Sequence, residues 1–298
     1  MPTLSVVIPT WNCAGRLLRA LRSVAAQTCG LGGVEALVID DGSTDDTAEQ
    51  VEMFAAQSLL RVRYVRQDNA GPAAARNHGL RLAGGDLIAF LDADDEWRPT
   101  KLARQIPLLS PRIGLVYCDN VFVDAQGREL SDYVRRIGMH RGDIQLALFC
   151  DFFLLTSAVV MTRAAVLAAG PFNEHLGVGE DYEFFLRAAR HCRVDYVEEK
   201  LLVRCVRADS LSRRDYVLDA RVDLATLQRF LRENPEFARQ HRRTVDQRIA
   251  RYRYDFAWRL LADRRRGAAA LELLKSLRRS ASLPALRALA RTLVPTSG

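Results

Sequence analysis

Short apolar runs alternate with amphipathic stretches along the first hundred residues. Runs of strand length occur at 4–8 (LSVVI), 34–39 (VEALVI), 62–65 (VRYV) and 87–91 (LIAFL). Between them, apolar residues recur at the spacing of one helix face, as with Leu17, Leu18, Leu21 and Val24. Continuous apolar runs are typical of strands covered on both faces. The alternation therefore predicts an α/β fold with a mainly parallel sheet, right-handed crossovers and helices on both faces.

The pattern changes further along the chain. Ser43 and Asp46 are spaced as a capping box before a helix that contains Val51 and Phe54. Beyond residue 95, apolar runs predict strands at 115–119, 121–124 and 157–162, a short helix at 163–170, a helix from about 179, and two strands near 194–206. From about residue 215 only helical patterns occur. We predict one α/β domain over 1–210 and a helical extension over 211–298.

The segments that follow the first four strands are rich in polar and charged residues. They read PTWN (9–12), DDGS (40–43), QDNAGPAAARN (67–77) and DADD (92–95). In parallel α/β sheets, ligands bind beyond the carboxyl ends of the strands. An acidic pair, an aromatic ring, an arginine and three aspartates are thus expected on one rim of the sheet.

The three aspartates of DADD pose an electrostatic problem. Like charges repel, and a carboxylate near a buried sheet loses hydration, so an uncompensated cluster would raise its own pKa values. A cation is one solution. The other is a structural role, in which Asp95 caps a helix that begins near Pro99.

Composition narrows the choice of protein class. The chain has 298 residues, 49% of them hydrophobic, which is enough for a substantial core. We find no apolar run of membrane-spanning length and no basic region before the first strand, so we expect a cytoplasmic protein. Its six cysteines are far apart and lack zinc spacing, so we expect reduced thiols.

Charge is distributed unevenly between the two predicted parts. Residues 1–200 have a net charge of −5, and residues 201–298 have a net charge of +12. The excess is almost entirely arginine, which can also reflect genomic base composition. No recognised nucleic-acid motif with interleaved aromatics accompanies it, so no nucleic-acid partner is expected.

Five segments in register carry a family resemblance. SVVIPTWN, VIDDGSTDDT, NAGPAAARNHGL, GDLIAFLDADDEW and GEDYEFFLRA resemble the family 2 glycosyltransferases of GT-A fold, over residues 1–210. The resemblance implies a nucleotide-diphosphate sugar donor, a divalent Mn²⁺ or Mg²⁺ ion, and transfer with inversion. A cation bridging the aspartates to a diphosphate would answer the electrostatic problem.

The same resemblance implies roles for individual residues. Asp94 would be the direct metal ligand and Asp92 would reach the ribose or the metal, with Ala93 between them, while Asp95 is favoured as a helix cap. Asp181 would be the catalytic base, and Glu180, the less favoured base, would lie at the donor. The residues expected to contact the rest of the nucleotide sugar are Pro9, Thr10 and Trp11 around the base, Asp41 at the base, Asp40 at the ribose, and Arg76 and Asn77 at the base or diphosphate.

Several of these assignments have a structural alternative. DDGST also fits an Asx turn with a helix cap. Arg76 also fits a solvated surface charge. Carboxylates such as Asp181 also suit a helix N-terminus through the helix dipole alone.

One segment departs from the family pattern. Where many members have a histidine that completes the metal site, this chain has Arg204 and Arg207. Arginine has no lone pair to give to a metal. Arg207 would instead contact the diphosphate, and the full coordination of the metal stays open.

The basic helical extension has two candidate partners. Leu271, Leu274 and Leu277, and then Leu286, Leu289 and Leu293, can share helix faces bordered by arginine. Such helices can lie on an anionic membrane, here the inner face of the plasma membrane. They can equally pack on the domain or on a second copy of the chain as a homodimer.

We conclude from the sequence that the chain is an inverting glycosyltransferase, using a UDP-sugar and acting on a cell-surface glycan or a lipid-linked acceptor. The alternatives are a sugar-nucleotide-binding protein without transfer activity and a nucleotidyltransferase. The second alternative lacks its Gly- and Arg-rich loop, because PTWNCAGRL follows the first strand. GLGG (30–33) precedes a strand instead of following one, which disfavours a dinucleotide fingerprint.

Overall fold

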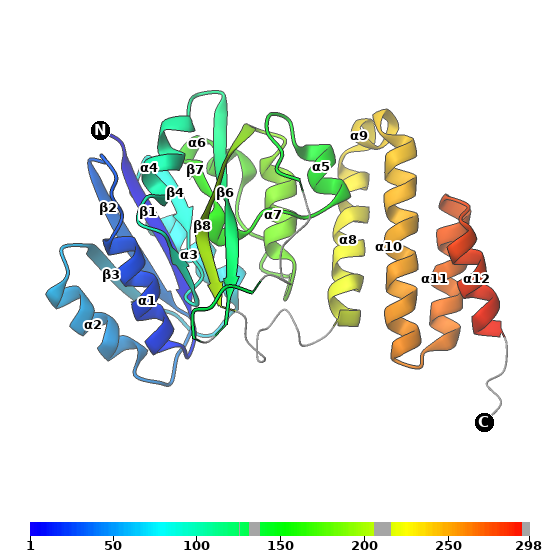
Figure 1. Cartoon of the computed structure of the whole chain (residues 1–298), viewed down its shortest axis with the longest axis horizontal. Helices are drawn as coiled ribbons and strands as arrows, with labels where there is room; N and C mark the ends of the chain where they lie inside the picture. The colour runs from blue at the N-terminus through cyan, green and yellow to red at the C-terminus, as the bar shows by residue number, and fades with distance from the viewer. Residues whose placement is uncertain (125, 131–137, 206–215, 294–298) are drawn as a thin grey trace. The chain divides into compact units, whose positions relative to one another are not determined.

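A computed structural model describes the chain except residues 125, 131–137, 206–215 and 294–298 (Figure 1). The chain divides into two compact units, Met1–Arg207 and Ala208–Gly298. The boundary predicted at 210/211 falls among the undescribed residues and stays a prediction.

The first unit is built on one eight-stranded mixed sheet with the order β3-β2-β1-β4-β7-β6-β8-β5. Neighbours pair in parallel from β3 to β4 and between β6 and β8, and antiparallel at β4–β7, β7–β6 and β8–β5. This confirms the predicted mainly parallel sheet. The strands are β1 (Thr3–Thr10), β2 (Gly33–Asp40), β3 (Arg61–Arg66), β4 (Leu87–Phe90), β5 (Asp95–Trp97), β6 (Ile113–Val123), β7 (Val160–Thr162) and β8 (Arg193–Cys205).

Helices cover both faces of this sheet (Figure 1). Val6 and Ile8 of β1 share a buried apolar cluster with Leu17 and Leu21 of the first helix. Val7 points the other way and packs against Gly79 of the third. The elements outside the sheet are α1 (Ala14–Ala25), α2 (Thr47–Gln57), α3 (Pro72–Leu82), α4 (Lys101–Gln105), α5 (Gln145–Cys150), α6 (Arg163–Ala169), α7 (Glu180–Ala188) and the 3₁₀ turns η1 (Ile106–Leu108) and η3 (Thr156–Ala158).

Several predicted boundaries were wrong. The runs at 115–119 and 121–124 are one strand, β6, and the two runs near 194–206 are one strand, β8. The register between them shifts around Asp119, so polar residues fall at an irregularity inside a continuous ladder. The strand predicted at 157–162 begins as the turn η3, and β7 covers only Val160–Thr162.

The predicted capping box at the start of α2 does not form. The Ser43 hydroxyl accepts a hydrogen bond from the Asn12 N–H at 2.9 Å instead. The Asp45 carboxylate accepts from the Thr47 N–H at 3.2 Å, and so caps the first turn from the position directly before the N-cap residue Asp46.

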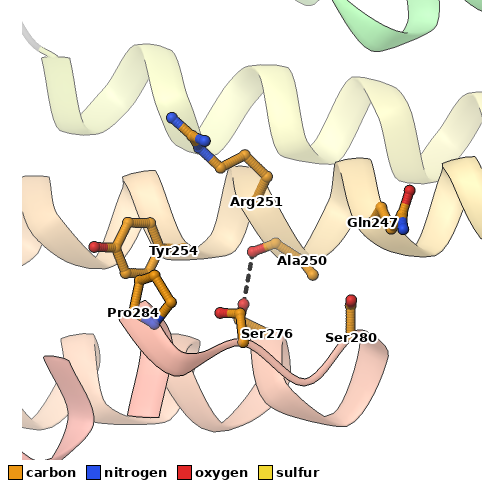
Figure 2. Close-up of a pocket in the computed structure, with 8 residues that line it drawn as sticks. Gln247, Ala250, Arg251, Tyr254, Ser276, Ser280 and Pro284 are labelled. Atoms are coloured by element: carbon orange, nitrogen blue, oxygen red, sulfur yellow. Dashed lines mark hydrogen bonds between the residues drawn. The ribbon is translucent and has the colours of Figure 1, made fainter. Parts of the chain in front are cut away.

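The second unit consists of helices: α8 (Tyr216–Glu233), α9 (Pro235–Gln240), α10 (Arg242–Ala262), α11 (Arg266–Arg279) and α12 (Leu283–Leu293). Arg253 of α10 pairs with the buried Glu272 of α11, and Arg279 pairs with Asp246 at 2.8 Å. The Ser276 hydroxyl donates to the Ala250 carbonyl beside a pocket between α10 and the turn before α12 (Figure 2). Across the described chain, every helix is too short or too polar to cross a bilayer.

Close packing of α3 on β1 depends on Gly79, which yields a test of the fold. A Cβ at this position would lie 2.4 Å from Val7 Cγ1, so Gly79→Ala should destabilise the unit by about 1–3 kcal/mol through overpacking. The matched control is Gly15→Ala in α1, where a Cβ meets nothing within 4 Å. It should be neutral or stabilising by up to about 1 kcal/mol. Equal urea midpoints for the two variants would contradict the packing described.

Candidate active site

The carboxyl ends of β1 and β2 lie side by side, because Thr10 pairs with Asp40 in the sheet. Beyond them Trp11 is 52% exposed, so its ring is available to a ligand. Thr10 is buried and its hydroxyl lies 3.2 Å from Cys13 Sγ. Pro9 is half-buried. Of the three residues predicted to form a base pocket, Trp11 is the one that offers a ring face.

Asp40 is engaged inside the chain. Its carboxylate accepts hydrogen bonds from the Ser43 N–H at 2.8 Å and from the Tyr64 hydroxyl, and it is 1% exposed. Burial and the Asp40 carboxylate both raise the pKa of Tyr64. This arrangement is the Asx-type turn that the sequence left as an alternative. The structure thus shows an internal role for Asp40, and its predicted ribose contact stays a prediction.

Asp41 fixes the segment that leads into α3. Its Oδ1 accepts from Gln67 Nε2 and from the Ala70 N–H, and its Oδ2 accepts from the Gly71 N–H, all at 2.8 Å. Gly71 has φ +91, a left-handed conformation that favours glycine. A carboxylate oxygen can accept more than one hydrogen bond, so Oδ2 retains acceptor capacity toward a ligand.

Arg76 ties together two distant parts of the site. Its Nη1 donates to Glu180 Oε1 at 2.6 Å and its Nη2 donates to Asp92 Oδ1 at 2.8 Å. The side chain is 6% exposed, so the alternative of a solvated surface charge is wrong. The guanidinium bridges these two carboxylates of the chain, and the predicted contact of Arg76 with base or diphosphate stays a prediction. The acidic partners raise the pKa of Arg76 against the effect of burial, so it stays charged.

Asn77, the next residue, has an internal role. Its amide N–H groups donate to the Phe172 carbonyl at 2.9 Å and to Glu174 Oε1 at 2.7 Å, and its Oδ1 accepts from the Phe172 N–H. Both donors are used to anchor the segment before α7. The structure shows this anchoring role for Asn77, and its predicted contact with the donor stays a prediction.

The DADD turn is held by a residue that sequence reasoning missed. Ser157 of η3 accepts from the Asp92 N–H at 3.0 Å, its hydroxyl also bonds Asp95, and its carbonyl accepts from Trp97 Nε1 at 2.8 Å. No spacing rule links residue 157 to residue 92, since only the sheet brings them together. Ala93 is buried in the apolar core beneath the turn.

Asp95 is not a helix cap. It begins β5, opposite Arg204 of β8, and pairs with Arg204 Nε at 3.5 Å. The residue that precedes α4 is Thr100. The capping prediction failed because the chain continues as a short antiparallel strand before α4 begins.

The ionised forms of several rim carboxylates are disfavoured, so their pKa values are raised. Burial, and then Asp92, raise the pKa of Asp94, against the opposing effects of Arg204 and Arg16. Burial raises the pKa of Asp95 to about 7 despite Arg204. Burial, followed by the neighbouring Glu180, raises the pKa of Asp181 to about 7, and Arg76 opposes this shift. Such shifts are typical of functional sites.

Asp181 and Glu180 have different environments at the start of α7. Glu180 is buried against Arg76, whereas Asp181 is only partly buried. Asp181 Oδ1 accepts from the Tyr182 N–H at 2.7 Å. Because Arg76 bonds both Asp92 and Glu180, Asp181 and the DADD turn are on the same rim.

Asp92 and Asp94 are the candidate ligands of a divalent cation. Among the described residues, no group of three or more His, Cys, Asp or Glu side chains has the geometry of a complete metal site. Mg²⁺ in enzymes is commonly held by one or two carboxylates together with water and substrate phosphates. Asp92 and Asp94, whose mutual repulsion contributes to the raised pKa of Asp94, fit such a partial site. Arg207 lies outside the described residues.

Comparison with known proteins gives consistent matches. Residues 5–164 match the family described as Glycosyl transferase family 2. The succinoglycan biosynthesis protein ExoU of Rhizobium meliloti is 33% identical over 229 residues, which cover 72% of this chain and 65% of ExoU. The chain spans 26% of the chondroitin synthase of Escherichia coli, to which it is 31% identical over 189 residues, and 65% of ExoU, so both relatives are longer proteins.

Two solved structures share the fold. One is the mannosyltransferase PcManGT from Pyrobaculum calidifontis, in complex with GDP-Man and Mn²⁺, with a TM-score of 0.65 at 23% identity. The match covers 97% of this chain and 79% of the PcManGT chain. Residues 1–349 of S. aureus TarS, in complex with UDP-GlcNAc, have a TM-score of 0.61 at 17% identity and cover 98% and 90%. These similarities confirm the predicted GT-A-type sheet.

Removing Arg76 should strongly destabilise the first unit. Arg76→Met leaves the buried Glu180 and the partly exposed Asp92 without their shared cation, with an expected loss of about 3–5 kcal/mol in the free energy of unfolding. The control Arg98→Met breaks an exposed pair with Glu129 at 3.8 Å and should cost less than about 1 kcal/mol. Urea denaturation of both variants checks this. A similar loss of stability in both variants would show that the Arg76 bridge contributes no more to folding than an exposed ion pair.

Proposed function

The chain belongs to glycosyl transferase family 2, and from that premise we propose that it transfers a sugar from a nucleotide-diphosphate sugar to an acceptor hydroxyl, with inversion and with a divalent cation. The family membership agrees with the glycosyltransferase predicted from the sequence. That PcManGT binds GDP-Man with Mn²⁺ and TarS binds UDP-GlcNAc supports the donor class, with either base.

The observation that carries the proposal is the Arg76 bridge. It joins Asp92, in the DxD segment, to Glu180, which immediately precedes Asp181. Inverting transfer needs a base on the side of the sugar opposite the leaving diphosphate. A single buried cation that orients both the DxD turn and the start of α7 is suited to hold these two groups in a fixed relation.

Asp94 and Asp92 would hold the divalent cation, Mn²⁺ or Mg²⁺. When bound, this ion would neutralise charge on the leaving diphosphate. Trp11 would stack on the base, and Asp41 would accept a hydrogen bond from it through Oδ2. A uracil N–H suits this acceptor, so a UDP-sugar is the first donor to test.

Asp181 would remove the proton of the acceptor hydroxyl. Its pKa of about 7 makes it a stronger base than an ordinary aspartate while a large fraction is still ionised near neutral pH. Glu180 is already paired with Arg76, which leaves Asp181 as the better candidate.

Substitution Asp181→Asn should abolish transfer while leaving UDP binding largely intact. In the wild type, kcat/KM should rise with pH and level off above about 7, because the carboxylate is the active form. A fully active Asn variant would remove Asp181 from the mechanism. UDP binding without transfer or donor hydrolysis by the wild type in Mn²⁺ would favour the alternative of a catalytically silent binder.

The same substitution should affect stability in a defined direction. The folded-state pKa of Asp181 lies above its ordinary value of 3.8, so the protonated form is favoured on folding. The stability it provides is fully present below the unfolded-state pKa and is lost as pH rises through about 7. The stability of Asp181→Asn relative to wild type should therefore increase from pH 5 to pH 8, and an unchanged difference would contradict the raised pKa.

The acceptor would be a growing cell-surface glycan or its lipid-linked precursor, met at the inner face of the plasma membrane. ExoU, a relative of this chain, is a succinoglycan biosynthesis protein, which supports a glycan acceptor. Helices α11 and α12 offer a surface for an anionic membrane. Exposed leucines on them are Leu271, Leu274, Leu283 and Leu286.

The charges of these helices match an anionic surface. Their one acidic residue, Glu272, is buried and paired with Arg253 and Lys275. Arg278, Arg287 and Arg291 are exposed. Leu277 and Leu289, predicted to share the apolar faces, are instead half-buried, and Leu283 replaces them on the exposed side.

The double substitution Leu283→Ser and Leu286→Ser should weaken binding to vesicles that contain anionic phosphatidylglycerol by about tenfold or more, because about 1 kcal/mol or more of apolar burial is lost at each position. Leu167→Ser, at an exposed leucine of α6 in the first unit, is the control. Flotation measures binding. Absence of the wild type from these vesicles, with loss of a dimer in the double variant by sedimentation, would assign this face to a second copy.

A further inference from the structure

The aspartates of the DADD turn already have cations of the chain beside them. Arg76 donates to Asp92 at 2.8 Å, and Arg204 pairs with Asp95 at 3.5 Å. Attraction to Arg204 and Arg16 also opposes the rise in the pKa of Asp94. Arg76 is committed to its second partner, Glu180, and is buried. Arg204 differs from it, because its side chain is 34% exposed and its described ion pair is a loose one.

The sheet fixes the position of Arg204. It lies opposite Asp95 in the antiparallel β5–β8 ladder and opposite Phe122 in the parallel β6–β8 ladder. Its guanidinium carbon is 5.6 Å from the centroid of the Phe122 ring. Three strands therefore hold this charge at the acidic rim.

The electrostatic effect of Arg204 reaches the whole turn. Asp95, Asp92 and Asp94 each raise the pKa of Arg204, in that order of effect, although burial opposes them. The Arg204 guanidinium is attracted to all three carboxylates. For the same reason it repels a divalent cation that approaches them. Because arginine has no lone pair, it cannot compensate by becoming a ligand.

We propose that Arg204 is a resident counter-cation that keeps the DADD turn from retaining a divalent metal ion until a nucleotide diphosphate arrives. The diphosphate brings enough negative charge to satisfy both the metal and Arg204. Metal and nucleotide consequently bind in a strongly coupled manner, each raising the affinity for the other by the same factor. This inference rests on the proposed function, since it assumes that a diphosphate is the natural ligand.

The test measures Mn²⁺ binding to the full chain without nucleotide, by electron paramagnetic resonance of free Mn²⁺. Arg204→Met should bind Mn²⁺ about tenfold or more tightly than wild type, since a nearby unit charge in a partly buried site is worth at least that factor. Arg204→Lys, which keeps the charge, should stay close to wild type. The control Arg104→Met removes an exposed arginine that pairs with Glu199 at 2.9 Å, and should change little.

Repeating the titration with UDP, and then GDP, separates this inference from the proposed function. In wild type, the nucleotide should raise the Mn²⁺ affinity by more than tenfold, and the gain should be smaller in Arg204→Met. Equal Mn²⁺ affinity of Arg204→Met and wild type without nucleotide would overturn the role of Arg204, whether or not nucleotide binds. Failure of both nucleotides to bind any variant would instead count against the proposed function.

If Arg204→Met does not fold, the wild type alone still decides. Mn²⁺ binding to the nucleotide-free wild type that is as tight as binding in the presence of UDP would overturn the proposal. Weak binding that UDP strengthens more than tenfold would support it, and Arg204→Gln provides a second neutral variant.

Discussion

The site depends on one buried interaction, in which the Arg76 guanidinium bonds Asp92 and Glu180 at once. These residues come from α3, from the turn after β4, and from α7, so a single cation fixes three elements that are far apart in sequence. Burying an ion pair costs desolvation energy, and the pair is retained only where its geometry is good. In this chain the Arg76 bridge serves to position residues, because it places Asp181 next to the DADD turn.

The same rim concentrates negative charge that the fold does not fully neutralise. Asp94, Asp95 and Asp181 all have raised pKa values, because burial and like charges disfavour their ionised forms. An arrangement that costs stability in the isolated protein is expected where a ligand will supply the missing charge. At the DADD turn, a divalent cation bound together with a nucleotide diphosphate would supply the missing positive charge. At Asp181, the proton taken from the acceptor hydroxyl would supply it.

Backbone anchoring lies beneath this charge pattern. Ser157 holds the DADD turn, Asp40 and Asp41 hold the loops after β2 and β3, and Asn77 holds the segment before α7. Several side chains expected to touch the ligand thus also hold the backbone around the other candidate site residues. A polar residue in a short sequence motif can bind a ligand or anchor the backbone, and its hydrogen-bond partners in the folded chain show the anchoring role.

The sequence by itself determined the class of sheet, the convergence of the strand ends on one rim and the family, because hydrophobic period and the order of short motifs are local properties. It could not determine that β6 and β8 are continuous strands, that Asp95 faces Arg204, or that Ser157 holds Asp92. These depend on strand pairing between residues 65 to more than 100 positions apart. Burial and partner choice, which decide whether Arg76 is a surface charge or a bridge, exist only once the chain has folded, because desolvation is a property of the packed surroundings.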